Sequence, residues 1–446
     1  MSVADLQELD CDLLILGAGP AGLSAAHAAH AQVGRLILAD ENPLPGGQIW
    51  RGGIKRWQDS RALKLWQSLQ QADRARVQCL WQARLVFIQQ GLALFETPTG
   101  AIRVSWHKLI LCNGARELLL PFPGWTLPKV MGAGGLQALI KSGMPVRGQR
   151  VVIAGTGPLL LAAALSAQQA GAQLLCIAEH RNWLELARFL LQLMLIAPTK
   201  FLQAVKLRWQ LRHIPYLSDA RVVAALGSTQ VEGVSLQQGQ QQRQLSCDIL
   251  ACGFGLIGNL EVARHLHCEL ESGPGGLRVR FDHQQASSQK HIWVAGEICG
   301  IGGVEQALVQ GRIAGLAASA QTLPDYLIRA RQQHARFARL LAEVFQLDAR
   351  LTQLSQDDTL VCRCEDVSKR ELRDYPDWRS AKLQTRVGMG PCQGRVCGAA
   401  CQILFNWPGV DLRAPIFPAK VSTLCALANN NTSTCQEQGI NKEDGV

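Results

Sequence analysis

Short apolar runs that end in glycine dominate the pattern of the chain. Residues 12–16 (DLLIL) are continuously apolar after Asp12 and stop at a glycine, which predicts a buried strand. Residues 23–32 (LSAAHAAHAQ) then predict a helix, and residues 35–41 (RLILADE) predict a second strand. The same order returns at 150–179. Two strand–helix–strand units in one chain predict an α/β fold with parallel sheets.

The turn between the first strand and its helix has the spacing Gly17-x-Gly19-x-x-Gly22, with Pro20 and Ala21 inside it. Gly17 permits the tight turn, Gly19 lets a pyrophosphate approach the backbone, and Gly22 lets the helix pack closely on the strand. The helix N-terminus offers free N–H groups and the positive end of its dipole to phosphates. In this strand–turn–helix context the glycines predict a dinucleotide site.

An acidic residue at the end of the second strand is expected to hold the ribose hydroxyls, and Asp40 and Glu41 both lie there. We favour Glu41, because it lies five residues before Gly46 and Gly47. An acidic residue followed by Gly46-Gly47-Gln48 resembles the FAD-dependent flavoproteins with two dinucleotide-binding domains. Backbone without side chains can pass close to the flavin side of the dinucleotide.

Two later segments resemble the other FAD elements of that superfamily. Residues 108–118 form an apolar strand that ends in Asn-Gly-Ala, and residues 291–315 form a strand, a Gly-rich turn and a long helix. The resemblance implies that Glu297, where an Asp is usual, meets the ribityl and pyrophosphate region. Together these elements imply one discontinuous FAD domain over residues 12–315. The cofactor-binding residues expected here are Asn113, Gly114, Gly296, Glu297, Gly302 and Gly303.

The second unit has Gly155-x-Gly157 at its turn and Glu179 at the end of its second strand, but Leu160 replaces the third glycine. In the flavin disulfide reductase architecture, such an inserted domain binds NAD(P). A leucine at this position is expected to push the helix away from the strand or to alter its entry angle. NAD(P), an adenine nucleotide and an empty scaffold therefore all stay open. The segment after Gly46 carries no CxxxxC pair, which disfavours dithiol chemistry beside the flavin.

Cysteines gather near the end of the chain. Cys362-x-Cys364 is followed, after 27 residues, by Cys392-x4-Cys397. Four thiolates from two short loops suit either an iron–sulfur cluster or structural zinc. Neighbouring glycines free backbone N–H groups for inorganic sulfides, and a redox centre beside a flavin links two-electron to one-electron chemistry. We expect Cys401 to be a core residue or a free thiol.

The segments LVCRCEDVS, KLQTRVGMGPCQGRVCG and GEICGIGGVEQALVQGRIAG give a more specific resemblance. They resemble the large flavoprotein subunits of hydrogen cyanide synthase (its B component), opine oxidases (their A component) and hydroxyproline dehydrogenases, and a part of the sarcosine oxidase alpha chain. The C-terminal piece is similar to the 2Fe–2S domain of bacterioferritin-associated ferredoxin, which has a shorter spacing between its last two cysteines. This resemblance implies that Cys362, Cys364, Cys392 and Cys397 bind a 2Fe–2S cluster.

The resemblance also implies a division of the chain and a set of partners. We expect the FAD domain at 1–125 and 256–325, the inserted Rossmann-like domain at 126–255, and the 2Fe–2S domain at 326–446. Such subunits pass electrons within a heteromeric amino-acid dehydrogenase, together with a smaller D-amino-acid-oxidase-like flavoprotein and in some cases a ferredoxin-like subunit. A self-sufficient NAD(P)H-dependent reductase and a scaffold with vestigial cofactors are the alternatives.

Composition adds constraints. The net charge of +10 comes from scattered residues without a dense basic run, so we expect no nucleic-acid partner. The N-terminus is not a secretory signal, and fifteen cysteines without such a signal indicate a reducing, cytoplasmic compartment.

The chain contains no run of 18 apolar residues, so we expect no membrane-spanning helix, although peripheral association with the inner membrane stays open. The segment 184–205 comes closest to a membrane-spanning helix, but Pro198 breaks it, so we expect a buried or amphipathic helix.

The residues His107, His213 and His283 are isolated in the sequence and offer no general-base constellation.

Overall fold

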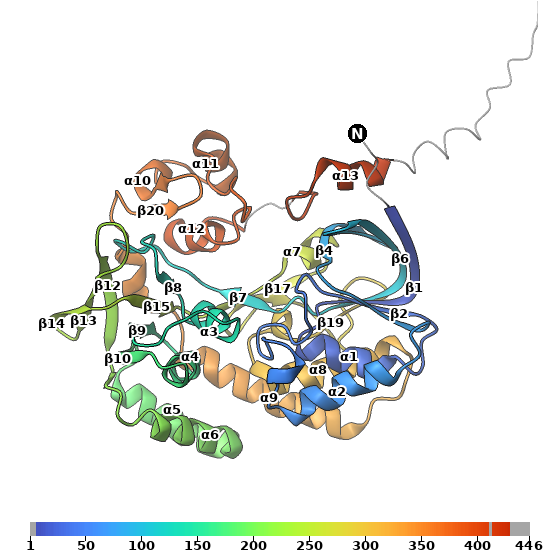
Figure 1. The fold of residues 1–446 in the computed structure, drawn as a ribbon, viewed down its shortest axis with the longest axis horizontal. Helices are drawn as coiled ribbons and strands as arrows, with labels where there is room; N and C mark the ends of the chain where they lie inside the picture. Colours follow the sequence, from blue (N-terminus) through green and yellow to red (C-terminus); the bar gives the residue numbers. More distant parts are fainter. Residues whose placement is uncertain (1–5, 410–412, 429–446) are drawn as a thin grey trace, which may run out of the picture.

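The computed structural model describes residues 6–409 and 413–428 of the chain (Figure 1). Its first sheet is built on β1 (Leu6–Leu16), which pairs in parallel with β2 (Leu36–Ala39) and with β6 (Gly100–Leu111). The strand order is β3-β2-β1-β6-β5-β4, and β19 (Ile292–Val294) adds to β6 in parallel. The remaining strands are β3 (Val77–Leu80), β4 (Arg84–Gln89) and β5 (Leu92–Thr97).

Both faces of this sheet are covered, which explains why the first apolar run does not alternate with polar residues. Leu13 and Ile15 face a core shared with α1 (Pro20–Ala29), α2 (Ser60–Gln71) and α8 (Gly303–Ala318). Leu14 and Leu16 face the opposite core, which includes α7 (Glu261–His265). The expected strand at 12–16 is therefore the buried end of a longer strand, β1.

Helix α8 lies directly against α1, although nearly 300 residues separate them in the chain. A Cβ on Gly311 would overlap the carbonyl oxygen of Ala21, and a Cβ on Gly315 would overlap that of Ala25. The two glycines therefore let the helix backbones approach much more closely than side chains would allow. This contact brings the Gly-rich turn before α8 next to the Gly-rich turn before α1.

The second sheet is entirely parallel, with the order β11-β10-β9-β15-β8. Strand β9 (Arg150–Gly155), helix α4 (Leu159–Gln169) and strand β10 (Gln173–Glu179) form the second predicted βαβ unit. Helix α3 (Ala133–Lys141) packs on α4. The other strands of this sheet are β8 (Val130–Gly132), β11 (Tyr216–Leu217) and β15 (Ile249–Gly253). A separate antiparallel sheet is formed by β12 (Ala220–Leu226), β13 (Gly233–Gln238) and β14 (Gln241–Ser246).

The two segments that connect the first sheet with the second sheet lie side by side. Strand β7 (Ala115–Glu117) leads toward it, β16 (Leu256–Gly258) returns from it, and the two form an antiparallel ribbon. The hairpin β17 (Leu270–Gly273) and β18 (Gly276–Val279) follows before the chain rejoins the first sheet. The domain boundaries expected at 125, 255 and 325 stay predictions.

Helix α9 (Asp325–Val344) packs on α8 and on α5 (Trp183–Ile196) and leads to a small C-terminal unit. This unit has its own core around Trp378 and contains the elements β20 (Leu360–Cys362), β21 (Val367–Ser368), α10 (Lys369–Leu372), α11 (Trp378–Thr385) and α12 (Cys397–Phe405). Helix α13 (Val421–Ala428) then returns to the first sheet, where the Arg103 guanidinium donates to the Ala426 carbonyl at 2.6 Å. Residues 429–446 of the expected C-terminal domain lie outside the described residues.

Pro198 breaks the most apolar helical segment, as predicted. Helix α5 ends at Ile196 and α6 (Pro198–Gln210) begins with the proline at its first position, where the missing N–H costs no hydrogen bond. Within residues 6–409 and 413–428, no helix is long and apolar enough to cross a membrane.

Candidate functional site

The first glycine turn has the geometry that its sequence predicts. Gly17 has φ +100°, and a Cβ there would overlap the Cys112 carbonyl oxygen, which directly follows β6. A Cβ on Gly22 would overlap the Gly17 oxygen, so helix α1 can start this close to β1 only with glycine. Gly19 is the N-cap and Pro20 is the first helical residue. The backbone of the turn is therefore bare at the N-terminus of α1, which is where a pyrophosphate would bind.

The two acidic residues after β2 have different positions. The Asp40 carboxylate is buried and accepts from the Ala18 N–H at 2.6 Å and from the Asn42 N–H at 2.8 Å. Glu41 is exposed beside it. Asp40 thus fixes the shape of the glycine turn, and the role of Glu41 in holding the ribose hydroxyls stays a prediction.

The second glycine pair closes over the same turn. The Gly46 N–H donates to the Ala18 carbonyl at 2.8 Å, and a Cβ on Gly47 would come within 2.9 Å of the Gly19 Cα. The Gln48 side chain accepts from Arg51. The structure therefore brings the sequence-predicted residues 46 and 47 against the phosphate-binding turn.

Asn113 and Gly114 follow β6 at the same carboxyl edge of the sheet. The Asn113 Oδ1 atom is buried without a hydrogen-bond partner, and nothing lies within 4 Å of a Cβ position on Gly114. A buried polar atom without a partner is costly, and a bound polar ligand would satisfy it. These residues therefore fit a dinucleotide that extends from the turn at Gly19.

The last expected element lies at the start of α8. The Glu297 carboxylate accepts from the N–H groups of Gly302 and Gly303, both at 3.0 Å. Burial raises the pKa of Glu297, and the two N–H donors oppose that shift. Glu297 thus caps α8 in this structure. Gly296 has φ +84°, and the nearby Gln306 Oε1 atom is buried without a partner. This oxygen and Asn113 Oδ1 are two buried polar atoms that a cofactor would satisfy.

The acidic residue after the second strand makes different hydrogen bonds in the two Rossmann turns. In the first unit Leu16 pairs with Ala39, so the residues that follow them, Gly17 and Asp40, are at equivalent positions. In the second unit Gly155 pairs with Glu179, and Glu179 therefore corresponds to Asp40. The Glu179 carboxylate is buried and accepts from the Thr156 hydroxyl at 2.6 Å and from the Gly157 N–H at 3.0 Å. The longer acid therefore occupies the N–H that corresponds to Gly19, which in the first site remains open for a phosphate.

The neighbouring strand makes room for Leu160, and the expected displacement or altered entry angle of α4 stays a prediction. Leu160 is buried and packs against Gly253 of the neighbouring strand β15, where a Cβ would come within 2.9 Å of the leucine. The glycine needed for close packing lies on the strand instead of the helix. A Rossmann shape is thus retained without the third glycine of the motif.

The residue that corresponds to Glu41 is His180. It is buried, stacks on Phe254 with ring centroids 6.0 Å apart, and has no hydrogen-bond partner on either ring nitrogen. Burial lowers the pKa of His180 to about 4. A neutral imidazole thus stands at the position of Glu41, so the second site lacks the acid expected to hold a ribose.

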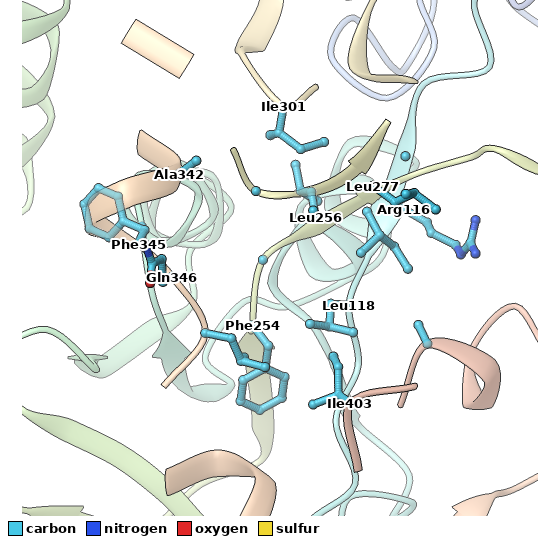
Figure 2. Close-up of a pocket in the computed structure, with 18 of the residues that line it drawn as sticks. Arg116, Leu118, Phe254, Leu256, Leu277, Ile301, Ala342, Phe345, Gln346 and Ile403 are labelled. Atoms are coloured by element: carbon cyan, nitrogen blue, oxygen red, sulfur yellow. The ribbon is translucent and has the colours of Figure 1, made fainter. Parts of the chain in front are cut away.

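A cavity of about 770 Å³ lies beyond this turn (Figure 2). Phe254 and Leu256 line it from the β15–β16 segment, Phe345 from the end of α9, and Ile403 from α12. Phe345 also covers the turn, since a Cβ on Gly157 would lie 3.6 Å from its ring. The lining is mostly apolar, and it comes from segments that lie far apart in the chain.

The cysteine residues predicted as cluster ligands lie together in the C-terminal unit. Cys364 lies beside Cys392, and Cys397 lies beside both Cys362 and Cys392. The neighbouring Cys397 thiol, together with N–H groups of the loops, lowers the pKa of Cys392 to about 5 and that of Cys362 to about 6. Two short loops therefore bring four sulfurs together, and two of these are stabilised as thiolates.

Four cysteines are chemically suited to the proposed two-iron cluster. In the described part of the chain, no three His, Cys, Asp or Glu side chains are already arranged around one point as metal ligands. A 2Fe–2S cluster places two thiolates on each iron, so it needs two pairs of cysteines. Gly390 is required beside Cys364, because a Cβ there would overlap the Cys364 Cβ. Cys401 lies fully buried in the core of the unit together with Cys362 and Cys397, and its exclusion from the ligand set stays a prediction.

Arg395 connects the cysteine loop to the first domain. Its carbonyl accepts from the Arg116 Nε at 3.1 Å, and Arg116 also forms an ion pair with Glu261 at 2.8 Å. The Arg395 guanidinium donates to the Ile416 carbonyl and stacks on the Phe417 ring at 3.8 Å. The sequence does not reveal these contacts, because 279 residues separate Arg116 from Arg395 and no motif includes them.

The sequence profile described as pyridine nucleotide-disulphide oxidoreductase matches residues 11–321. The chain belongs to this family. It is 32% identical to the A component of opine oxidase from Agrobacterium tumefaciens, covering 93% of this chain and 92% of the relative. It is also 32% identical to the HcnB component of hydrogen cyanide synthase from Pseudomonas aeruginosa, covering 87% and 91%. The solved structure of L-proline dehydrogenase from P. horikoshii has a TM-score of 0.71 at 16% identity, covering 94% of this chain and 80% of that one, and so shows a shared fold.

These matches confirm the resemblance and the prediction of a flavin-dependent oxidoreductase, and they support FAD as its cofactor. The opine oxidase and cyanide synthase relatives are each one subunit of a larger enzyme. The family name refers to a disulphide, but the segment after Gly47 holds tryptophan and arginine instead of a cysteine pair. His107 and His283 are exposed, with side chains 78% and 67% accessible, which agrees with the expectation that they are not catalytic.

The different positions of Asp40 and Glu41 predict different effects of their variants. Glu41→Gln is expected to weaken FAD binding about tenfold, since it removes a charge-assisted hydrogen bond to ribose, without changing apoprotein stability. Asp40→Ala is expected to lower the free energy of unfolding by about 1–3 kcal/mol, because it leaves buried N–H groups without a partner. Flavin fluorescence titration and urea unfolding of the apoproteins measure the two effects. Equal loss of stability in both variants would contradict this assignment.

The buried His180 predicts a pH-dependent stability. Its pKa in the folded state is about 4, below the ordinary value of 6.5, so the unfolded chain binds more protons between these values. Stability should therefore fall as pH drops from 6.5 toward 4, by up to about 1.4 kcal/mol per pH unit from this group. His180→Phe keeps the stacking on Phe254 and should lose this component. Urea unfolding of both proteins across that range provides the measurement, and parallel pH profiles would argue against it.

Proposed function

We propose that this chain is the FAD- and 2Fe–2S-containing subunit of a heteromeric dehydrogenase that oxidises an amine or amino acid of the opine, hydroxyproline or glycine type. The observation that carries the proposal is the four-cysteine cluster, which Arg395 attaches to the FAD-type domain. A subunit that only bound FAD would not require four convergent cysteines. The names of the relatives, which describe an opine oxidase and a cyanide-producing synthase, support the substrate class.

FAD supplies two-electron chemistry, and a 2Fe–2S cluster supplies one-electron steps. The chain binds and orients these groups. The turn at Gly19 and the N-terminus of α1 would hold the pyrophosphate, Glu41 the ribose, and Asn113 a polar edge of the cofactor. The loop N–H groups stabilise the charged form of the thiolates that would bind iron.

We further propose that the partner is a smaller D-amino-acid-oxidase-like flavoprotein, in some complexes joined by a ferredoxin-like subunit, in the cytoplasm. The relatives that are subunits support a multi-subunit assembly. The substrate-oxidising groups would then belong to the partner, which agrees with the exposed positions of His107 and His283. The net charge of +10 would favour docking to an acidic subunit.

The cluster assignment predicts the metal content of cysteine variants. Anaerobically purified wild-type chain should contain about two irons and two sulfides. Cys362→Ser and Cys397→Ser should lose most of both, because each removes one ligand from a different loop. Cys401→Ala is the matched control, since Cys401 is buried in the same core but outside the set of four. Iron and acid-labile sulfide analysis with electron paramagnetic resonance of the reduced protein measures the result. Zinc without iron in the wild type would refute the electron-transfer role of this unit.

The second Rossmann site predicts no direct reaction with NAD(P)H. Glu179 occupies the Gly157 N–H, His180 replaces the ribose-binding acid, and Phe345 covers the turn. We therefore expect no bleaching of the flavin when NADH or NADPH is mixed with the protein anaerobically in a stopped-flow instrument. Dithionite, which needs no binding site, is the positive control. Rapid bleaching by either nucleotide would favour the self-sufficient reductase, and the lack of any bound flavin after reconstitution would favour a scaffold.

A further inference from the structure

Helices α5 and α6 carry more exposed large hydrophobic side chains than all the rest of the described chain. Nine of the sixteen large hydrophobic side chains exposed in the described residues lie between 183 and 209. Leu195 is 79% exposed, and Trp183 and Trp209 are 66% and 64% exposed. We call this set the α5–α6 apolar face; its members are Trp183, Leu184, Leu190, Leu191, Met194, Leu195, Leu202, Val205 and Trp209. A concentration of this kind on a folded protein indicates an interaction surface.

The exposed residues follow helical spacing, so they form stripes. Along α5, the residues at 184, 191 and 195 repeat at one side of the helix, and along α6 those at 202, 205 and 209 do the same. The opposite side of α5 is already packed, since Phe189 and Leu193 are buried against the end of α9. The apolar face is therefore additional to the core. At 14 and 13 residues the helices are each about 20 Å long.

The charges around this face are nearly all positive. Five basic residues lie within 183–212, and Glu185 is the single acid there, which leaves a net charge of +4. The basic residues are Arg188, Lys200, Lys206, Arg208 and Arg212; of these, Lys200 is already paired with Glu305 of α8 at 2.5 Å, which leaves the other four to contact a ligand. Arg188 and Lys206 are exposed, and Arg212 stacks on Trp209 with its guanidinium carbon 4.3 Å from the ring. The pairing of tryptophan and leucine with arginine and lysine is typical of helices that lie in a membrane interface.

We infer that the α5–α6 apolar face is a peripheral membrane-binding element that docks on an anionic bilayer. Its leucines and tryptophans enter the boundary between headgroups and acyl chains, and its cations contact anionic headgroups. A second copy of the chain is a poorer occupant, because it would bring two positively charged faces together. Figure 1 shows α5 and α6 at one edge of the molecule, away from α10, α11 and α12, so binding there leaves the cysteine loop accessible.

Flotation of the full-length protein with lipid vesicles tests this inference and does not depend on the proposed electron-transfer role. The wild type should float with vesicles of phosphatidylcholine and phosphatidylglycerol, and much less with phosphatidylcholine alone. The double variant Leu191→Asp, Leu195→Asp should bind at least about tenfold more weakly, because both side chains would enter the apolar layer. Leu383→Asp is the matched control, since Leu383 is 66% exposed on α11, outside this face, and should bind as the wild type does.

A second variant separates charge from apolar contact. Arg188→Glu with Lys206→Glu should also weaken binding at least about tenfold, and added salt should weaken wild-type binding. This variant decides the question if the aspartate variant fails to fold, which thermal unfolding will show. The inference is wrong if the wild type does not float, or if it binds neutral vesicles equally well. It is also wrong if light scattering shows that the leucine variants abolish self-association, or if they abolish binding of a partner subunit, while flotation is unchanged.

Discussion

The close packing of α8 on α1 is the contact on which the nucleotide site depends. Gly311 and Gly315 allow the α8 backbone to lie against Ala21 and Ala25, in a contact that side chains at either glycine would prevent. The contact joins the two ends of a domain interrupted by the second sheet. It also places the N-termini of two helices, each preceded by a glycine turn, at the same edge of the first sheet. Two helix N-termini at one edge favour binding of a negatively charged cofactor there.

The same strand–turn–helix plan serves two different purposes in this chain. In the first copy the shorter Asp40 accepts from the Ala18 N–H, one residue before Gly19, so the Gly19 N–H stays open. In the second copy the longer Glu179 reaches one residue further and occupies that N–H itself. One methylene group thus separates a turn that can receive a phosphate from a turn that is already satisfied. Function follows from the free hydrogen-bonding groups of a fold more than from the fold itself.

The C-terminal unit is small, but its attachment gives it a defined position. Arg395 lies between two of the proposed ligands, and its backbone and side chain contact both the first domain and the segment that leads to α13. Stacking on Phe417 holds the guanidinium in place. The loop is thereby tied to the FAD-type domain through a residue that binds neither cofactor. The proposed electron-transfer role would benefit from such rigid placement, because a preorganised geometry needs no rearrangement.

Local patterns in the sequence determined the βαβ units, the glycine turns, the break at Pro198 and the grouping of four cysteines, because each depends on residues close together in the chain. The comparison with known families added FAD and the subunit role. Only the tertiary structure showed which backbone N–H each buried acid accepts from, and that the bare Gly253 on β15 makes room for Leu160. It also showed that Arg116 contacts Arg395. These features depend on distances between strands and helices that are far apart in sequence. The exposure of the α5 leucines belongs to the same group, since an apolar helix is buried or exposed according to what packs against it.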